Sequence, residues 1–193
     1  MTDRPLRADA RRNRDRLLEV AVRSLALDGP EVPLEAIARA AGVGIGTLYR
    51  HFPTREALVE AAYRNELDRL CSSVPGLLAA ESPDRALRDW MDLFLDYMVT
   101  KKGMADALRA VIASGGNPYA HSRDMLLAAI GELLTAGVTA SAIRPDVPAE
   151  DVFAALTGVT LTVGDPDRRD QARRLLDLLM DGLRSVTRSP GNG

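Results

Sequence analysis

Five side chains that can bind nucleic acid lie close together in the run GTLYRHFPTR. They are Thr47, Tyr49, Arg50, His51 and Arg55. Hydroxyl, imidazole and guanidinium groups donate hydrogen bonds to phosphate oxygens and to the edges of bases. A short helix that carries such groups near its start has the chemistry of a helix-turn-helix that reads DNA.

Two short helices joined by a glycine-containing turn have to position these side chains. Apolar residues at helical spacing predict the first helix over 34–41, and Gly42 ends it because glycine tolerates a left-handed cap. The second helix carries the polar group and ends before Pro53, which cannot continue a helix. Thr54 is then expected to cap a longer helix over about 55–74.

The rest of the chain also predicts helices, so we expect an all-α fold of eight or nine helices. A first helix is expected over 9–27, behind a mobile arm at residues 1–8, and Pro75-Gly76 should kink or interrupt the fourth. Further helix starts are marked by a capping residue before a proline, at Ser82-Pro83, Asn117-Pro118 and Asp165-Pro166. The helices expected in this half are 83–99, 103 to the stop at Ser114-Gly115-Gly116, 118–140, 149–163 and 166–187, before a disordered tail at 188–193.

The charge of the chain is unevenly distributed. The 193 residues carry a formal net charge of −2, but residues 1–55 hold ten arginines against seven acidic residues, and the remainder is net acidic. Nucleic acid would be drawn to the first segment. Taken alone, however, a charge difference this small could equally well have arisen by chance.

Several classes of protein are excluded. A single cysteine, Cys71, leaves no intrachain disulfide and no cysteine-rich metal site. The N-terminus lacks the apolar stretch of a signal peptide, and no apolar run reaches the roughly 20 residues that a membrane span needs. An enzyme is the main rival class, but the two histidines are far apart and no hydrolase, metalloprotease or nucleotide-binding motif occurs. We expect a cytoplasmic protein without membrane contact, catalytic residues, metal ligands or cofactor.

The run GVGIGTLYRHFPTREAL resembles the DNA-binding signature of the tetracycline-repressor (TetR) family of bacterial regulators, over about residues 10–62. The resemblance implies three N-terminal helices for DNA and a homodimer. It divides the chain into a DNA-binding domain at 1–55, a linking helix at 55–74 and a ligand-binding and dimerisation domain at 75–187.

The resemblance also implies roles for single residues. In such proteins the third helix enters the major groove; Ile45, Gly46 and Thr47 would then face base edges with Arg50 close to them, and Tyr49, His51 and Arg55 would contact phosphates. Packing of Tyr49 against the first helix and a local backbone hydrogen bond of His51 remain alternatives. We expect Leu48 and Phe52 to be core residues.

Two positions depart from the family pattern. Gly44 and Ile45 stand where the family usually has Ser and Lys, and the apolar Ile45 cannot donate a hydrogen bond. Pro33 stands where Thr or Ser often caps the second helix and touches phosphate. Neither change removes DNA binding, but both alter the expected operator contacts.

The second half supplies candidates for a ligand pocket and a dimer interface. Apolar side chains at helical spacing are typical of plain core as well as of a pocket. The pocket candidates are Trp90, Phe94, Met98, Met104, Leu108 and Met125, with Tyr119 and His121 as polar groups that would orient a ligand. The last two helices carry apolar faces that, by the resemblance, form a four-helix bundle with a second copy, and the interface candidates are Phe153, Leu156, Val159, Leu175, Leu179 and Leu183.

These observations predict a homodimeric transcriptional repressor that binds a near-palindromic double-stranded operator and responds to an unknown small-molecule effector. Three alternatives stay open: an architectural DNA-binding protein without ligand control, a regulator controlled by a partner protein, and a helical enzyme. An exposed apolar patch would favour the partner protein, and an enclosed cavity would favour the small molecule.

Overall fold

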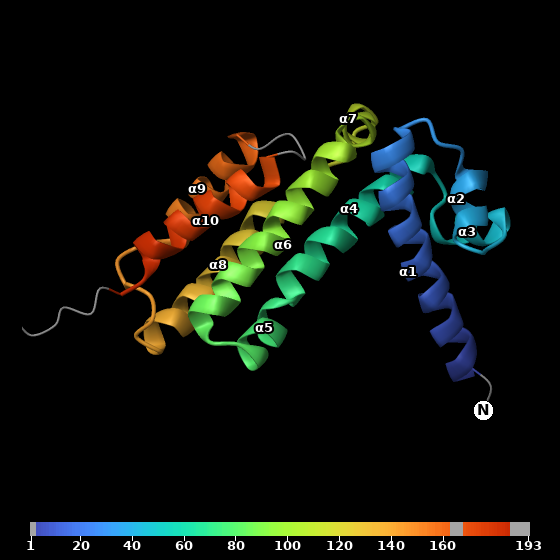
Figure 1. Cartoon of the computed structure of the whole chain (residues 1–193). Coiled ribbons are helices and arrows are strands. Elements are labelled where there is room, and N and C mark those ends of the chain that lie inside the picture. The colour runs from blue at the N-terminus through green and yellow to red at the C-terminus, as the bar shows by residue number, and fades with distance from the viewer. Residues whose placement is uncertain (1–2, 163–167, 186–193) are drawn as a thin grey trace, which may run out of the picture. The chain divides into compact units, whose positions relative to one another are not determined.

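The computed structural model describes residues 3–162 and 168–185, and helices make up nearly all of these two ranges (Figure 1). The predicted all-α fold is confirmed. The helices are α1 (Asp3–Asp28), α2 (Leu34–Ala40), α3 (Ile45–His51), α4 (Arg55–Ser72), α5 (Val74–Ala80), α6 (Pro83–Gly103), α7 (Ala105–Ala113), α8 (Ser122–Thr139), α9 (Ala149–Thr162) and α10 (Arg169–Leu183).

Several helix boundaries differ from expectation, and the described residues form ten helices, not eight or nine. Helix α6 continues to Gly103 instead of ending near 99, and α10 ends at Leu183 instead of near 187. Helix α1 begins at Asp3, inside the predicted arm, because Pro5 lies in the first turn where its missing N–H costs nothing. The predicted interruption after α4 is a separate short helix, α5, with Pro75 in its first turn. Helix α8 begins at Ser122, not at 118, because His121 before it has the left-handed φ of 62°. The predicted start at Asp165-Pro166 and the tail at 188–193 lie outside the described residues.

Predicted helix caps are present in part. The backbone N–H of Ala57 donates to the Thr54 hydroxyl at 3.1 Å, so Thr54 caps α4 as expected. The Ser82 hydroxyl instead donates to the Asp84 carboxylate at 2.7 Å, and this hydrogen bond lowers the pKa of Asp84. Pro33 precedes α2 without a side-chain cap, in agreement with its missing hydroxyl.

The chain folds into two compact units, which are not continuous in sequence. The first contains residues up to 68 together with 99–120, and the second contains 69–98 together with the residues from 121 onward. The last turn of α6, all of α7 and the loop after it therefore pack with the N-terminal helices.

In the first unit, α1 packs against α2 and α3 over a fully buried aliphatic core. The segment 99–120 is held by close contacts. Gly103 lies against Ala26 of α1, and Lys101 lies over the rings of Tyr63 and Tyr119, with 4.6 Å between its Nζ and the Tyr119 centroid. Burial lowers the pKa of Lys101, and the two tyrosine rings meet edge to face at 5.4 Å.

In the second unit, α9 packs between α8 and α10, and α5 packs against α8. Trp90 of α6 is fully buried, and its indole N–H donates to the Leu70 carbonyl at 3.1 Å. The Phe94 ring stacks on it one turn later, with 5.9 Å between centroids. These contacts satisfy the indole N–H and fix α6 within the core.

A ladder of ion pairs joins α6 to α10. Acidic and basic residues recur every fourth position on α6, so each turn presents one charge to α10. Single exposed pairs contribute little to stability, but a series at this spacing fixes the register of the two helices. The pairs are Asp84–Arg184 at 3.8 Å, Arg88–Asp177 at 2.7 Å, Asp92–Arg173 at 3.7 Å and Asp96–Arg169.

The contact of α6 with α1 generates a prediction. A Cβ at Gly103 would lie 2.9 Å from the Cβ and 3.2 Å from the Cα of Ala26, so Gly103→Ala should lower the free energy of unfolding by about 1–3 kcal/mol. Gly131→Ala in α8 is the control: no atom lies within 4 Å of its added Cβ, and helix propensity should raise stability by about 0.5–1 kcal/mol. Urea unfolding measures both, and equal effects would contradict the close packing.

Candidate DNA-binding interface

A tight glycine turn sets the angle between α2 and α3. Gly42 has φ of +69°, a conformation that other residues rarely adopt. The N–H of Gly42 donates to the Arg39 carbonyl at 3.0 Å, and the N–H of Val43 donates to the Ala38 carbonyl at 3.0 Å. Both bonds satisfy carbonyls at the end of α2, so the chain reverses at this point without unpaired backbone groups.

The short helix α3 has one buried side and one exposed side. Leu48 is fully buried and Phe52, directly after the helix, is almost fully buried, which confirms both as core residues. Tyr49 is 46% exposed, and Arg50 and Gly46 are exposed as well. The residue types that bind DNA therefore lie on the outer side of the helix, and the apolar anchor lies beneath it.

Arg50 contacts two of the residues that the family resemblance assigns to base edges. Its Nε donates to the Gly46 carbonyl at 3.1 Å, and its Nη2 donates to the Thr47 hydroxyl at 3.5 Å. The guanidinium thus lies along the exposed side of α3 next to Gly46 and Thr47. Ile45 and Thr47 are half-buried at the start of the helix.

Arg55 has a role that the sequence did not indicate. Its Nη1 donates to the Pro30 carbonyl at 2.9 Å in a partly buried position, so the start of α4 is tied to the loop between α1 and α2. A guanidinium has five donors, and the others remain for a phosphate. His51 is half-buried, and its ring lies 6.1 Å from that of Phe52.

Two segments of the chain, which together make up most of it, each match a known protein family. Residues 17–62 match the bacterial regulatory proteins of the tetR family. Residues 82–185, more than half of the chain, match the C-terminal domain of SbtR-like transcriptional regulators. The chain belongs to the TetR family.

Individual TetR-family proteins resemble the chain to different degrees. A crystal structure of a TetR transcriptional regulator from Streptomyces coelicolor has a TM-score of 0.86 and 58% identity, and the match covers 90% of this chain and 99% of that one. LfrR from Mycobacterium smegmatis, crystallised in complex with proflavine, has a TM-score of 0.59 and 26% identity, with 89% and 94% covered. HTH-type transcriptional regulators of Staphylococcus aureus are 30% identical over 113 residues, which span 58% of this chain and 60% of each relative.

Family membership confirms two of the expectations from the sequence. The chain is a DNA-binding transcriptional regulator of the TetR type and not an enzyme. The described helices include none that is long and apolar enough to cross a membrane. Within the same residues, no three His, Cys, Asp or Glu side chains are grouped as metal ligands.

In this TetR-family regulator the pocket candidates are divided between the two units. Met104, Leu108 and Tyr119 belong to the first unit, and the other five belong to the second. Trp90, Phe94, Met104 and Leu108 are fully buried in packed cores, whereas Met98 and Met125 are half-buried. Tyr119 contacts Lys101, and the His121 side chain is 84% exposed.

The interface candidates fall on two sides of their helices. Leu156 and Leu183 are buried in the core of their own protomer. Phe153, Val159, Leu175 and Leu179 are half-buried, and Phe153 meets the Phe94 ring edge to face at 6.3 Å. The outer side of α10 borders an open hollow of about 470 Å³, lined by Gln171, Arg174, Leu175, Asp177, Leu178 and Asp181.

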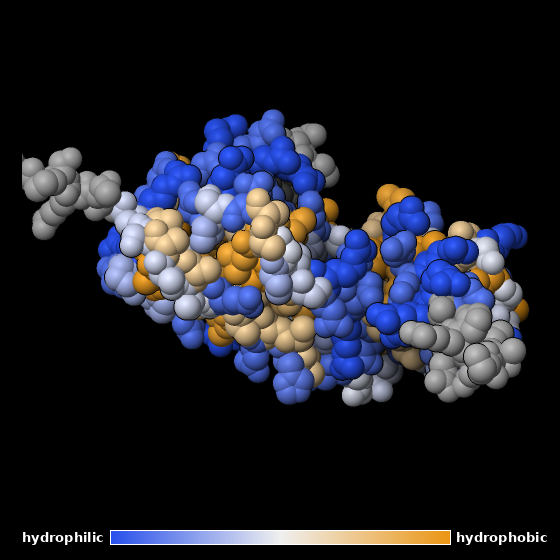
Figure 2. Space-filling model, turned by 90° about the horizontal axis from the view of Figure 1, so that it is seen from below, coloured by the Kyte–Doolittle hydropathy of each residue, from blue (hydrophilic) through white to orange (hydrophobic). Residues whose placement is uncertain are grey.

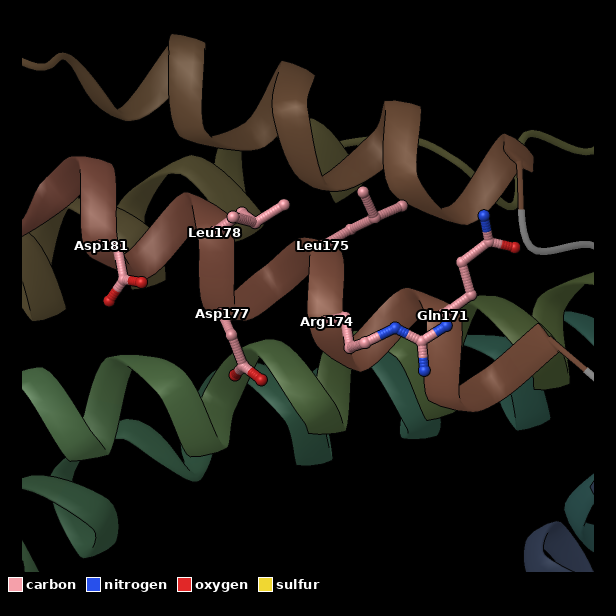
Figure 3. Close-up of a pocket in the computed structure, with 6 residues that line it drawn as sticks. All are labelled: Gln171, Arg174, Leu175, Asp177, Leu178 and Asp181. Atoms are coloured by element: carbon pink, nitrogen blue, oxygen red, sulfur yellow. The ribbon is translucent and has the colours of Figure 1, made fainter.

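Two exposed leucines lie on these helices in addition to the interface candidates. Leu178 is 67% exposed and Leu161 is 78% exposed. Figure 3 shows Leu175 and Leu178 on the side of α10 next to α9, and Asp177 on the opposite side, where it pairs with Arg88. The spacing of Leu175, Leu178 and Leu179 was the available signal, because these residues form a second apolar stripe beside the buried one.

The contact of Arg55 generates a prediction. Arg55→Ala should lower the free energy of unfolding by about 1–2 kcal/mol, because the partly buried Pro30 carbonyl loses a charged donor. Arg50→Ala is the control: it removes an exposed arginine with two hydrogen bonds and should leave stability unchanged. Urea unfolding of both variants distinguishes them, and an unchanged Arg55→Ala would assign Arg55 to DNA alone.

Proposed function

We propose that this TetR-family regulator is a homodimeric repressor that binds a specific, near-palindromic operator in the cytoplasm and releases it when a small molecule binds. The observation that supports specific binding is the two-sided α3, with Leu48 inward and Tyr49 and Arg50 outward. The same side chains on a flexible segment would not hold a fixed position against base edges.

Within the operator complex, we assign different partners to the residues of α3. Gly46, Thr47 and Arg50 form one hydrogen-bonded group on α3, which fits base edges in the major groove. Ile45 beside them suits a thymine methyl group. The Tyr49 hydroxyl, the His51 imidazole and the remaining donors of Arg55 suit phosphates.

A second copy is proposed to pack on α9 and α10. The surface that would be covered consists of Leu161 and Leu178 with the half-buried Phe153, Val159, Leu175 and Leu179. Exposed leucines on two adjacent helices are typical of an interface, because a second helix pair can bury them in a bundle. Dimerisation also fits sequence-specific DNA binding, since the helix-turn-helix motifs of the two protomers would bind half-sites about 34–36 Å apart.

The effector is proposed to be a small, largely apolar molecule. The relative LfrR was crystallised in complex with proflavine, and the chain is similar to LfrR over most of its length. Among the pocket candidates, Met98 and Met125 are half-buried and flexible enough to rearrange around a ligand. Release of DNA requires that the effector binds the DNA-free form more tightly than the DNA-bound form.

Footprinting tests the proposal against its main alternative. The purified protein should protect a discrete, near-palindromic site upstream of its own coding sequence at moderate salt, with random DNA as the control. Diffuse protection that moderate salt abolishes on every DNA tested would favour an architectural protein.

The role of Arg50 gives a prediction on the footprinted site. Arg50→Ala should relax the preference at one base pair by about 1–3 kcal/mol, because a guanidinium binds guanine in two places. Tyr49→Phe should instead weaken binding to all duplexes alike, since a phosphate contact carries no sequence information. Titration of single-base variants of the site measures both effects. An equal loss for Arg50→Ala on operator and random DNA excludes base reading.

The dimer surface gives a further prediction. Leu178→Arg should shift the protein to monomer with little change in the stability of the protomer, because Leu178 is exposed. Operator affinity should fall, because the two DNA-binding motifs are no longer linked. Val99→Arg is the control, since Val99 is 62% exposed and lies outside α9 and α10. Analytical ultracentrifugation measures the mass, and a dimeric Leu178→Arg protein would place the interface elsewhere.

A further inference from the structure

The positive charge of the N-terminal segment lies in one part of α1, residues 3–16, which we call the arm. Residues 1–16 hold six of the ten arginines in residues 1–55, together with three aspartates. Residues 17–55, which include α2 and α3, hold four arginines and four acidic residues. The segment 17–55 is therefore neutral overall, and the whole excess of three positive charges in residues 1–55 comes from the arm.

The side chains of the arm that the structure describes, residues 9–16, are exposed apart from the half-buried Asn13. Arg11, Arg12, Arg14 and Arg16 are all exposed, and the first buried residues of α1 are Leu17 and Leu18. Figure 1 shows the N-terminal turns of α1 extending beyond α2 and α3, and Figure 2 shows a mostly hydrophilic surface around them. At 1.5 Å per residue the arm is about 20 Å long, or about six base-pair steps of a duplex.

Two arginines join the arm to both ends of α3. The Arg14 guanidinium lies over the Phe52 ring, 5.6 Å from its centroid, directly after α3. The Nη1 of Arg16 lies 3.7 Å from the position of a Cβ on Gly42, in the turn before α3. The arm is thus continuous with the surface proposed to read DNA, and Arg11 and Arg12 lie one turn further out.

We propose that the arm is a second DNA-binding surface, whose arginines bind phosphates flanking the half-site read by α3. The inference rests on the proposed function, and DNA is the partner that its charge fits. Exposed guanidinium groups on a helix contact phosphates without reading sequence, so the arm adds affinity and salt dependence but no base preference.

The internal contacts of the arm suit this role. Arg12 forms an ion pair with Asp9 on the next turn, which stabilises the helix without removing its net charge. Helix stability comes mostly from packing of an apolar face, and residues 9–16 of the arm include no buried residue. Contact with phosphates would add interactions along this exposed part of α1.

The test replaces Arg11 and Arg12, which are exposed and lie further from α3 than Arg14 and Arg16. Arg11→Gln/Arg12→Gln removes two charges and keeps helix propensity, because Gln and Arg are similar helix formers. The control, Arg109→Gln/Arg123→Gln, removes the same charge from exposed arginines on α7 and α8. Arg11→Lys/Arg12→Lys keeps the charge. Circular dichroism and ultracentrifugation establish that all four proteins fold and assemble alike.

Affinity is measured on the footprinted site as a 20-base-pair duplex, and on the same site with six further base pairs at each end, between 50 and 200 mM salt. For the glutamine variant, the log–log salt slope should be shallower by about 0.9 for each phosphate that it no longer neutralises. Because each protomer neutralises two phosphates fewer, and the dimer four, the affinity deficit of this variant relative to wild type should narrow by about a hundredfold over this salt range. Wild type, the control and the lysine variant should gain affinity from the longer duplex, and the glutamine variant should gain less.

The outcomes separate this inference from the proposed function. If the glutamine variant matches the control in slope and in its gain from the flanks, the arm does not bind DNA, although operator binding stands. If the lysine variant is weakened as much as the glutamine variant, the effect is not one of charge and the inference fails. If wild type binds neither duplex above random DNA, the proposed function fails and the arm has no half-site to flank.

Discussion

The burial of Leu48 is the constraint on which DNA reading depends. Helix α3 has only seven residues, so one fully buried side chain fixes its rotation about its own axis. Successive residues are about 100° apart around a helix, and a slip of one position would bury Tyr49 and expose Leu48. With Leu48 beneath the helix, Tyr49 and Arg50 are outside it, and the left-handed Gly42 sets where the helix begins.

The unit that holds α3 is larger than the sequence signature suggests. The family signature ends near the first turns of α4, yet the compact unit also contains residues 99–120 from the second half of the chain. Gly103 allows α6 to approach Ala26 of α1 at a distance that any larger residue would prevent. Lys101 and Tyr119, from the same segment, contact the ring of Tyr63 on α4. The helices that support α3 are therefore braced by residues that no local motif contains.

The sequence predicted what local chemistry decides. Proline, glycine and capping residues mark most helix ends, and Thr54 caps α4 as its hydroxyl suggests. The start of α8 was missed because His121 adopts a left-handed φ, which is uncommon for residues other than glycine. The ladder between α6 and α10 was also invisible, because charges at every fourth position of α6 are equally typical of a solvated face.

The sequence predicted which residues form the outer side of α3, but it did not predict which distant residues they contact. The outward position of Tyr49 and Arg50 follows from the spacing around Leu48, whereas the bond from Arg55 to Pro30 joins residues 25 positions apart. The division of α10 into two apolar sides was predictable only in part. Leu176 and Leu175 are neighbours in a run of leucines, and only packing shows that the first is buried and the second borders the hollow. The DNA roles themselves come from the resemblance and not from periodicity.

The distribution of charge explains how a chain with a net charge of −2 can approach DNA. Long-range attraction depends on the local excess of cations, and within residues 1–55 that excess lies in the first turns of α1, because the segment 17–55 is neutral overall. The exposed side of α3 carries a single guanidinium, that of Arg50, beside Gly46 and Thr47. This side can therefore discriminate between bases while contributing few contacts to phosphates. Phosphate contacts add to the binding of specific and of random DNA alike, so discrimination between the two is left to the contacts of α3 with bases. The helix-turn-helix and the basic arm thus divide recognition from attraction along one continuous surface.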